Sequence, residues 1–206
     1  MNKIRILLAD DHPFLRLGLK SRIAVEPDLS VVGEADNGED AVQAVARLEP
    51  DIVVMDLMMP VLSGTEATKR IHTEHPEIRI LVLTSFGSSR DLVEALDAGA
   101  SGALLKDSSM DDFIAALRTI ARGERFLSPE ISQILRESET APKLTDRQLE
   151  ILESAVRGFT DREIAEQFGI TQSGAKHHMR SIFAKLGAAN RSEAIGIALR
   201  KHLLKI

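Results

Sequence analysis

Short apolar runs and longer segments with helical spacing alternate along the first 122 residues. The apolar runs cover residues 4–9, 30–35, 52–55, 80–83 and 102–105. Each has the length and the β-branched or leucine-rich composition of a buried strand. Because strands that alternate with helices form βαβ units, the pattern predicts a flavodoxin-like α/β domain with a doubly wound, five-stranded parallel sheet.

This pattern ends near residue 122. The next twenty residues contain Ser128–Pro129 and a polar run that ends at Pro142, with no sustained apolar period. Proline favours the first turn of a helix, so a short helix over residues 129–136 is expected within this stretch. We predict that residues 123–142 link a first domain, residues 1–122, to a second, residues 143–206.

Helix-start signals dominate the second domain. Thr145 and Thr160 are each followed three residues later by Gln or Glu, which is the spacing of a capping box. Asn190 is followed by Glu193 in the same way, and Gly169 and Gly187 stand where helices commonly end. These signals predict a small all-α domain of four helices, over residues 146–156, 161–168, 172–186 and 191–199.

The second and third of these helices, joined through Gly169, have the spacing of a helix-turn-helix. Along the third helix the apolar residues that recur at helical spacing are Ala175, Met179, Ile182 and Leu186. The polar residues at its start and on its other side are Thr171, Gln172, Ser173, Lys176, His177 and Arg180. Such a helix fits the major groove of double-stranded DNA, so these six are candidate contacts. An amphipathic surface helix with incidental charge is the alternative.

Charge and composition support two domains with different partners. Residues 1–125 carry 14 Lys and Arg against 21 Asp and Glu, a net charge of −7, whereas residues 143–206 carry 11 against 7, a net charge of +4. A basic second domain suits an anionic partner such as nucleic acid. The chain has no Cys, which excludes disulfides, thiolate catalysis and Cys-based metal sites. Without a membrane span or a signal peptide in the sequence, we expect a cytoplasmic protein that does not contact membranes.

Polar residues stand where the predicted strands end. Asp10 and Asp11 follow the first strand, Asp56 the third, Thr84 the fourth and Lys106 the fifth. The carboxyl ends of parallel strands meet at one edge of a sheet, so these side chains should lie together. Crowded carboxylates need positive charge, which Lys106 and a divalent ion would supply, and oxygen ligands favour Mg²⁺. A carboxylate beside Mg²⁺ and Lys can accept a phosphoryl group that the Thr84 hydroxyl would bind, while helix caps and surface ion pairs are the alternative.

The first domain resembles the receiver domain of two-component response regulators over about residues 1–122. The matching motifs are Leu8-Ala9-Asp10-Asp11-His12, Val54-Met55-Asp56-Leu57-Met58-Met59-Pro60, Leu83-Thr84 and Leu104-Leu105-Lys106-Asp107. The resemblance implies that a histidine kinase phosphorylates Asp56 and that Thr84 and Lys106 engage the phosphoryl group. It also implies that Asp10, Asp11, Asp56 and the backbone carbonyl of Met58 bind Mg²⁺. Ala103 stands where that family commonly has an aromatic switch residue. Phe86 and a shift of the following helix are the candidate substitutes for that switch.

The second domain resembles the LuxR-type DNA-binding domain. The matching motifs are Leu144-Thr145-Asp146-Arg147-Gln148, Arg162-Glu163-Ile164-Ala165, Lys176-His177-His178, Lys185-Leu186-Gly187 and Asn190-Arg191-Ser192-Glu193-Ala194. Gln148 replaces a Glu that is usual in that family. By these two resemblances the chain is identified as a member of the NarL/FixJ family of response regulators. The resemblance implies that phosphorylation controls dimerisation and that a homodimer binds promoter DNA.

Two other functions remain open from the sequence. A Mg²⁺-dependent phosphohydrolase could use Asp56 as nucleophile, but such enzymes carry an acid two residues further on, where this chain has Met58. A regulator with an atypical receiver could bind DNA independently of phosphorylation, which Ala103 keeps possible. His12, His72 and His75 fit surface or helix-cap positions better than metal ligation, because no third ligand motif accompanies them.

Overall fold

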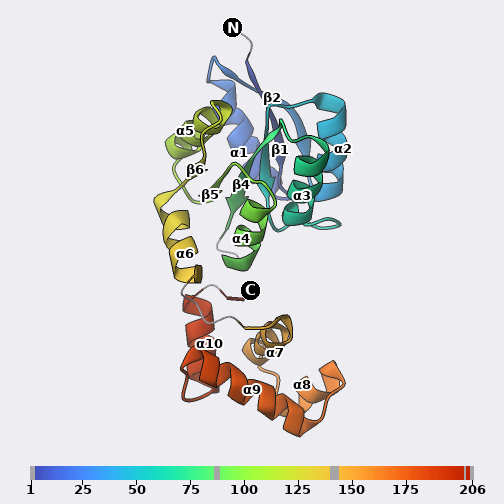
Figure 1. The fold of residues 1–206 in the computed structure, drawn as a ribbon. Coiled ribbons are helices and arrows are strands. Elements are labelled where there is room, and N and C mark those ends of the chain that lie inside the picture. The colour runs from blue at the N-terminus through green and yellow to red at the C-terminus, as the bar shows by residue number, and fades with distance from the viewer. Residues whose placement is uncertain (1–2, 86–88, 140–143, 202, 205–206) are drawn as a thin grey trace. The chain divides into compact units, whose positions relative to one another are not determined.

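The computed structural model describes residues 3–85, 89–139, 144–201 and 203–204 (Figure 1). These residues form two compact units, one built on a parallel sheet and one helical. Of the described residues, 3–85 and 91–132 belong to the first unit, and 89–90 and those from 133 onward belong to the second. Over the same residues, no helix combines the length and the apolar character that crossing a membrane requires.

The first unit is a doubly wound α/β fold, as the sequence predicts. Within the described part of the chain all six strands are parallel, in the order β2-β1-β3-β4-β5-β6. Their bounds are β1 (Ile4–Ala9), β2 (Leu29–Ala35), β3 (Ile52–Asp56), β4 (Arg79–Thr84), β5 (Gly102–Leu105) and β6 (Phe126–Leu127). The expected five strands are therefore joined by a sixth, which pairs with Gly102 and Ala103. It escaped prediction because two residues are too short to show strand periodicity.

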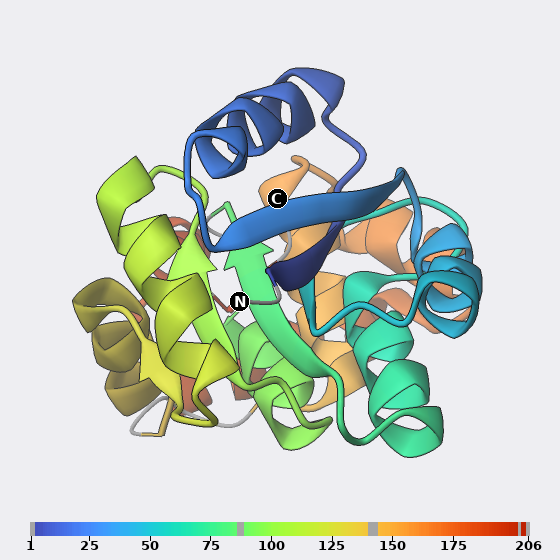
Figure 2. The ribbon, with the colours of Figure 1, turned by 90° about the horizontal axis from the view of Figure 1, so that it is seen from above.

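Helices cover both faces of this sheet (Figures 1 and 2). Helices α1 (Pro13–Ala24) and α5 (Met110–Ala121) pack on one face, against strand residues such as Leu8 and Val54. Helices α2 (Gly38–Leu48) and α3 (Gly64–Glu74) pack on the other, against Leu7 and Val53. Successive strand side chains point to opposite faces, so each apolar run serves both layers of the core. A further helix, α4 (Ser89–Asp97), precedes β5.

The expected linker, residues 123–142, is more structured than the sequence suggests. Its first part supplies β6, and its helix, α6 (Pro129–Glu139), extends three residues beyond the expected end at Arg136. Ser128 is 3% exposed and Ile131 is fully buried. Burial of Ile131 and strand pairing by Phe126 associate the start of this segment with the sheet, which a short stretch of sequence does not reveal.

The second unit contains the four expected helices. They are α7 (Asp146–Val156), α8 (Asp161–Phe168), α9 (Gln172–Leu186) and α10 (Arg191–Arg200). Both hydrogen bonds of a capping box are made at Thr145 and at Thr160. Gly169 ends α8 at a φ of 62°, in the left-handed region that glycine adopts without strain. One apolar cluster joins all four helices, so the cap signals and the buried stripe specify the same structure.

Candidate functional site

The polar residues at the strand ends converge at the carboxyl edge of the sheet. Asp10, Asp56 and Thr84 are 3%, 1% and 5% exposed. The Nζ atom of Lys106 lies 2.7 Å from Oδ2 of Asp10 and 2.8 Å from Oδ2 of Asp56. One ammonium therefore bridges two buried carboxylates that come from different strands.

Burial and ion pairing act against each other on the charges of this group. Burial raises the pKa of Asp56, and hydrogen bonding to Lys106 opposes that rise. Burial also works to lower the pKa of Lys106, but its hydrogen bonds to Asp10 and Asp56 prevail and raise it. Lys106 thus stays protonated. Its single positive charge faces two carboxyl groups, so a bound cation would stabilise their ionised forms.

A cluster of possible metal ligands adjoins this ion pair. Asp10, Asp11, His12 and Asp56 each offer one ligand atom, and these four atoms all lie within 4.8 Å of one another. Three of the four are carboxylate oxygens, which are the donors that Mg²⁺ prefers. The chemistry of the donor set therefore fits a divalent cation.

His12 belongs to this cluster, although the sequence analysis favoured a surface or helix-cap position for it over metal ligation. It is the N-cap residue of α1, but its side chain makes no capping hydrogen bond. Its Nδ1 atom lies 2.7 Å from Oδ1 of Asp11 and 3.1 Å from Oδ1 of Asp10. The only signal in the sequence is that His12 directly follows the two aspartates. His72 lies in the last turn of α3 and His75 is its C-cap residue, outside this cluster.

The segment after Asp56 is held close to the site by its backbone. The N–H of Met58 donates to Oδ1 of Asp56 at 3.3 Å, and the N–H of Gly64 donates to the carbonyl of Leu57 at 3.0 Å. A Cβ atom at Gly64 would overlap the carbonyl oxygen of Asp56. Glycine at this position therefore permits α3 to begin directly beside the buried aspartate.

Thr84 ends β4 next to the lysine, and its carbonyl accepts the N–H of Lys106 at 2.9 Å. Ala103 is fully buried in β5, in register with Val82 on one side and Leu127 on the other. Phe86, one candidate substitute for an aromatic switch, lies outside the described residues.

The third helix of the helical unit has the predicted two sides. Ala175, Met179, Ile182 and Leu186 are all buried. The six candidate DNA contacts are exposed, from the N-cap Thr171 through Gln172, Ser173, Lys176 and His177 to Arg180. The side chain of Thr171 accepts the N–H of Gly174 at 3.1 Å, so the helix begins at Gln172 despite the glycine in its first turn.

Gln148 ties α7 to this helix. Its Oε1 atom accepts the N–H of Thr145 at 3.0 Å and the Nζ of Lys185 at 2.8 Å, and its Nε2 donates to Oγ of Ser181 at 2.9 Å. The side chain is 6% exposed. An amide can satisfy donors and acceptors at once, which explains how Gln serves where Glu is usual in the resembling family.

The sheet with its acidic cluster and the helix-turn-helix unit together define the class of DNA-binding response regulators. Residues 6–118 match the family model of the response regulator receiver domain, and residues 142–198 match that of the bacterial regulatory proteins of the luxR family. The chain belongs to the response regulators that combine these two domains, as the sequence predicts. It is therefore a regulator and not the alternative phosphohydrolase.

Known relatives match nearly the whole chain. The response regulator protein VraR of Staphylococcus aureus is 35% identical over 207 residues, which cover 98% of this chain and 99% of VraR. The crystal structure of the response regulator ChrA of a heme-sensing two-component system is 32% identical, with a TM-score of 0.62 and coverage of 99% of this chain and 100% of ChrA. RcsB of Salmonella enterica serovar Typhimurium, solved bound to a promoter in the presence of the phosphomimetic BeF₃⁻, is 26% identical, with a TM-score of 0.69 and coverage of 95% and 98%.

Proposed function

We propose that a histidine kinase phosphorylates Asp56 in a Mg²⁺-dependent reaction, and that this modification controls dimerisation and promoter binding. The observation that carries the proposal is the position of the Asp56 carboxylate. One of its oxygens pairs with Lys106, and the carboxylate adjoins the ligand cluster that includes Asp10 and Asp11. A nucleophilic carboxylate between two sources of positive charge suits phosphoryl transfer.

Each neighbouring residue has a role in this proposal. Asp10, Asp11 and Asp56 would hold Mg²⁺ with the backbone carbonyl of Met58, and the bound ion would neutralise charge on the phosphoryl oxygens. Lys106 would pair with the phosphoryl group after transfer, and the hydroxyl of Thr84 would donate a hydrogen bond to it. Thr84 is the last residue of β4, which pairs with β3, and Lys106 directly follows β5, which pairs with β4.

The helical unit supplies the output. Two copies of the chain would each place α9 in the major groove of double-stranded DNA, with Thr171, Gln172, Ser173, Lys176, His177 and Arg180 toward the duplex. The relatives support this part of the proposal, because RcsB has been solved as dimers bound to DNA and in a promoter complex with a phosphomimetic. A two-fold symmetric dimer would require an inverted repeat in the promoter.

Mass spectrometry tests the phosphoacceptor. A small phosphodonor with Mg²⁺ should add one phosphoryl mass to the wild type and to the control Asp107→Asn, whose aspartate is exposed next to Lys106. Asp56→Asn should gain none. Undiminished labelling of Asp56→Asn would place the phosphoryl group on another residue.

A second candidate function, DNA binding that is independent of phosphorylation, is favoured by one observation. Ala103 fills its buried position in β5 without an aromatic side chain that could change position on phosphorylation. Selection of bound sequences from a random DNA library, with and without the phosphodonor, separates the two functions. The affinity of the protein for the selected DNA is then measured with and without the phosphodonor. An affinity that rises on phosphorylation supports control through Asp56, whereas equal affinities support the second candidate.

A further inference from the structure

The imidazole of His12 is directed at the acidic cluster although the proposed phosphorylation assigns it no role. Its Nδ1 atom approaches a carboxylate oxygen of Asp11 at 2.7 Å and one of Asp10 at 3.1 Å. As the N-cap residue of α1 it could instead have bonded the helix backbone, but its side chain does not. Two-thirds of the side chain is exposed, so the ring lies at the solvent side of the cluster.

The separations between these atoms fit two neighbouring ligands of one metal ion. At metal–ligand bonds of about 2.0–2.1 Å, adjacent ligands of an octahedron lie about 2.9 Å apart and opposite ligands about 4.2 Å apart. The two Nδ1–oxygen distances fall on either side of the first value, and the four ligand atoms of the cluster all lie within 4.8 Å of one another. One metal ion could therefore contact all four residues after small adjustments.

The remaining carboxylate contacts leave this ligand set available. Lys106 pairs with the Oδ2 atoms of Asp10 and Asp56. The Oδ1 atom of Asp10 is the one that approaches the imidazole. The Oδ1 atoms each accept one backbone N–H, that of His12 on Asp10 at 2.8 Å and that of Met58 on Asp56 at 3.3 Å. A carboxylate oxygen has a second lone pair, so both Oδ1 atoms can still bind a metal ion. Both aspartates are more than nine-tenths buried.

We propose that His12 is a nitrogen ligand of this metal site. Its imidazole makes the site bind first-row transition ions such as Mn²⁺ in preference to Mg²⁺. The inference rests on the proposed metal site formed by Asp10, Asp11 and Asp56. Mg²⁺ is bound through oxygen and gains little from imidazole, whereas imidazole is a common ligand of transition ions. With the proton of the ring on Nε2, Nδ1 presents a lone pair to the metal.

Calorimetry and pulsed electron paramagnetic resonance of the full chain test this assignment. We expect His12→Gln to lower the affinity for Mn²⁺ about tenfold and to change that for Mg²⁺ less than twofold, a tenfold change being ~1.4 kcal/mol. Mn²⁺ bound to the wild type should show coupling to a ¹⁴N nucleus, and His12→Gln should lose it. The matched control is His72→Gln, which lies in α3 outside the cluster and should retain both properties.

The outcomes separate this inference from the function on which it rests. Mn²⁺ that binds the wild type without ¹⁴N coupling, or with the same affinity in His12→Gln, would overturn ligation by His12 and leave the carboxylate site intact. Failure of both ions to bind the wild type would overturn the metal site together with the inference. Circular dichroism of each variant ensures that a lost affinity does not come from unfolding.

Discussion

Gly64 lies so close to the backbone of Asp56 that a Cβ atom added to the glycine would overlap the carbonyl oxygen of the aspartate. This contact joins the start of α3 to the phosphoacceptor candidate. Because backbone atoms cannot move aside as a flexible side chain can, Gly64→Ala should lower the free energy of unfolding by about 1–3 kcal/mol. Urea denaturation followed by circular dichroism would measure the loss.

Gly18 provides the control for that experiment. It lies in α1 and is exposed. Apart from its chain neighbours and the backbone of its own helix, no atom lies within 4 Å of the place where a Cβ would be added. Gly18→Ala should therefore raise stability by about 0.5–1 kcal/mol, because alanine loses less backbone freedom in a helix. Equal stability of Gly64→Ala and the wild type would show that the loop after Asp56 can move at no cost.

Removal of the Gln148 amide should destabilise the helical unit. Gln148→Ala deletes the buried partner of Ser181 and Lys185, which we expect to cost about 1–3 kcal/mol. Gln148→Glu should cost less, because a carboxylate still accepts from Lys185 and from the backbone of Thr145. Thermal unfolding would compare both with Gln133→Ala, an exposed position in α6. The bridging role would be refuted if all three variants melted alike.

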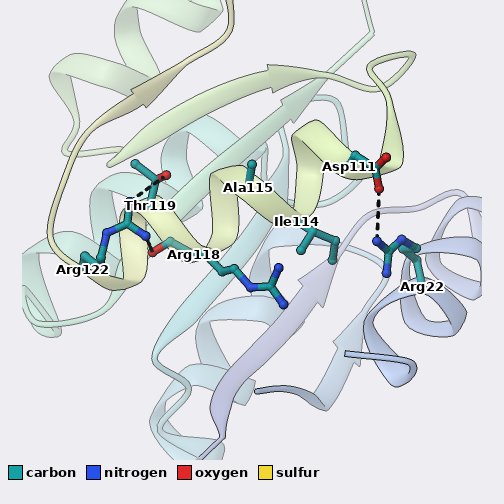
Figure 3. A pocket seen from close by; sticks show the side chains of 7 residues that line it. All are labelled: Arg22, Asp111, Ile114, Ala115, Arg118, Thr119 and Arg122. Atoms are coloured by element: carbon teal, nitrogen blue, oxygen red, sulfur yellow. Dashed lines mark hydrogen bonds and ion pairs between the residues drawn. The ribbon is translucent and has the colours of Figure 1, made fainter. Parts of the chain in front are cut away.

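Acid should weaken the first unit by protonating the carboxylates of Glu26 and Asp28, which pair with Arg118. Arg118 lines the groove between α1 and α5 (Figure 3). Hydrogen bonding to Arg118 lowers the pKa of Asp28, and hydrogen bonds from Arg22 and then Arg118 lower that of Glu26. A carboxyl group whose pKa is lower in the folded state contributes stability above its unfolded pKa. The ordinary pKa is 4.5 for Glu26 and 3.8 for Asp28. The contribution to stability is lost as the pH falls from these values through the lower pKa values of the folded state.

The variant Arg118→Gln isolates this contribution. It should be less stable than the wild type at pH 7 and should lose less stability on acidification to pH 3, since its carboxyl groups titrate nearer their ordinary pKa values. Arg125→Gln, an exposed arginine of the same unit, should follow the wild type. Parallel stability curves for Arg118→Gln and the wild type between these pH values would contradict the prediction.

The exposed side of α9 should determine which DNA sequence is bound. Lys176→Ala should cost about 1–3 kcal/mol on the selected site and relax the preference at one position of each half-site. Arg180 lies one turn further on, and if it contacts a phosphate, Arg180→Ala should weaken all sequences alike and reduce the salt slope by about 1.

Binding to the selected site and its single-base variants over a salt series would distinguish these effects. Arg157→Ala, an exposed basic position at the end of α7, is the control and should change sequence preference at no position. If Lys176→Ala and Arg180→Ala both bind every variant as the wild type does, the DNA-reading surface lies elsewhere.

Elements that depend on local pattern were predicted closely from the sequence. The helices over residues 146–156, 161–168 and 172–186 begin and end as expected, because capping side chains and terminal glycines act within a few residues. The strand β6 was missed, since its two residues become a strand only by pairing with β5. The fold class follows from periodicity, whereas the edge of the sheet depends on contacts distant in sequence.

The sequence by itself determined that Asp10, Asp56, Thr84 and Lys106 would meet, because parallel strands bring their carboxyl ends to one edge whatever lies between them. Only the tertiary structure decided that Lys106 bridges Asp10 and Asp56, and that His12 turns its ring toward the carboxylates instead of capping α1. Strand order and helix periodicity are set by backbone geometry and burial, which leave a pattern along the chain. The direction of one side chain depends on rotamers and charges contributed by several elements, so it is fixed only when those elements are assembled.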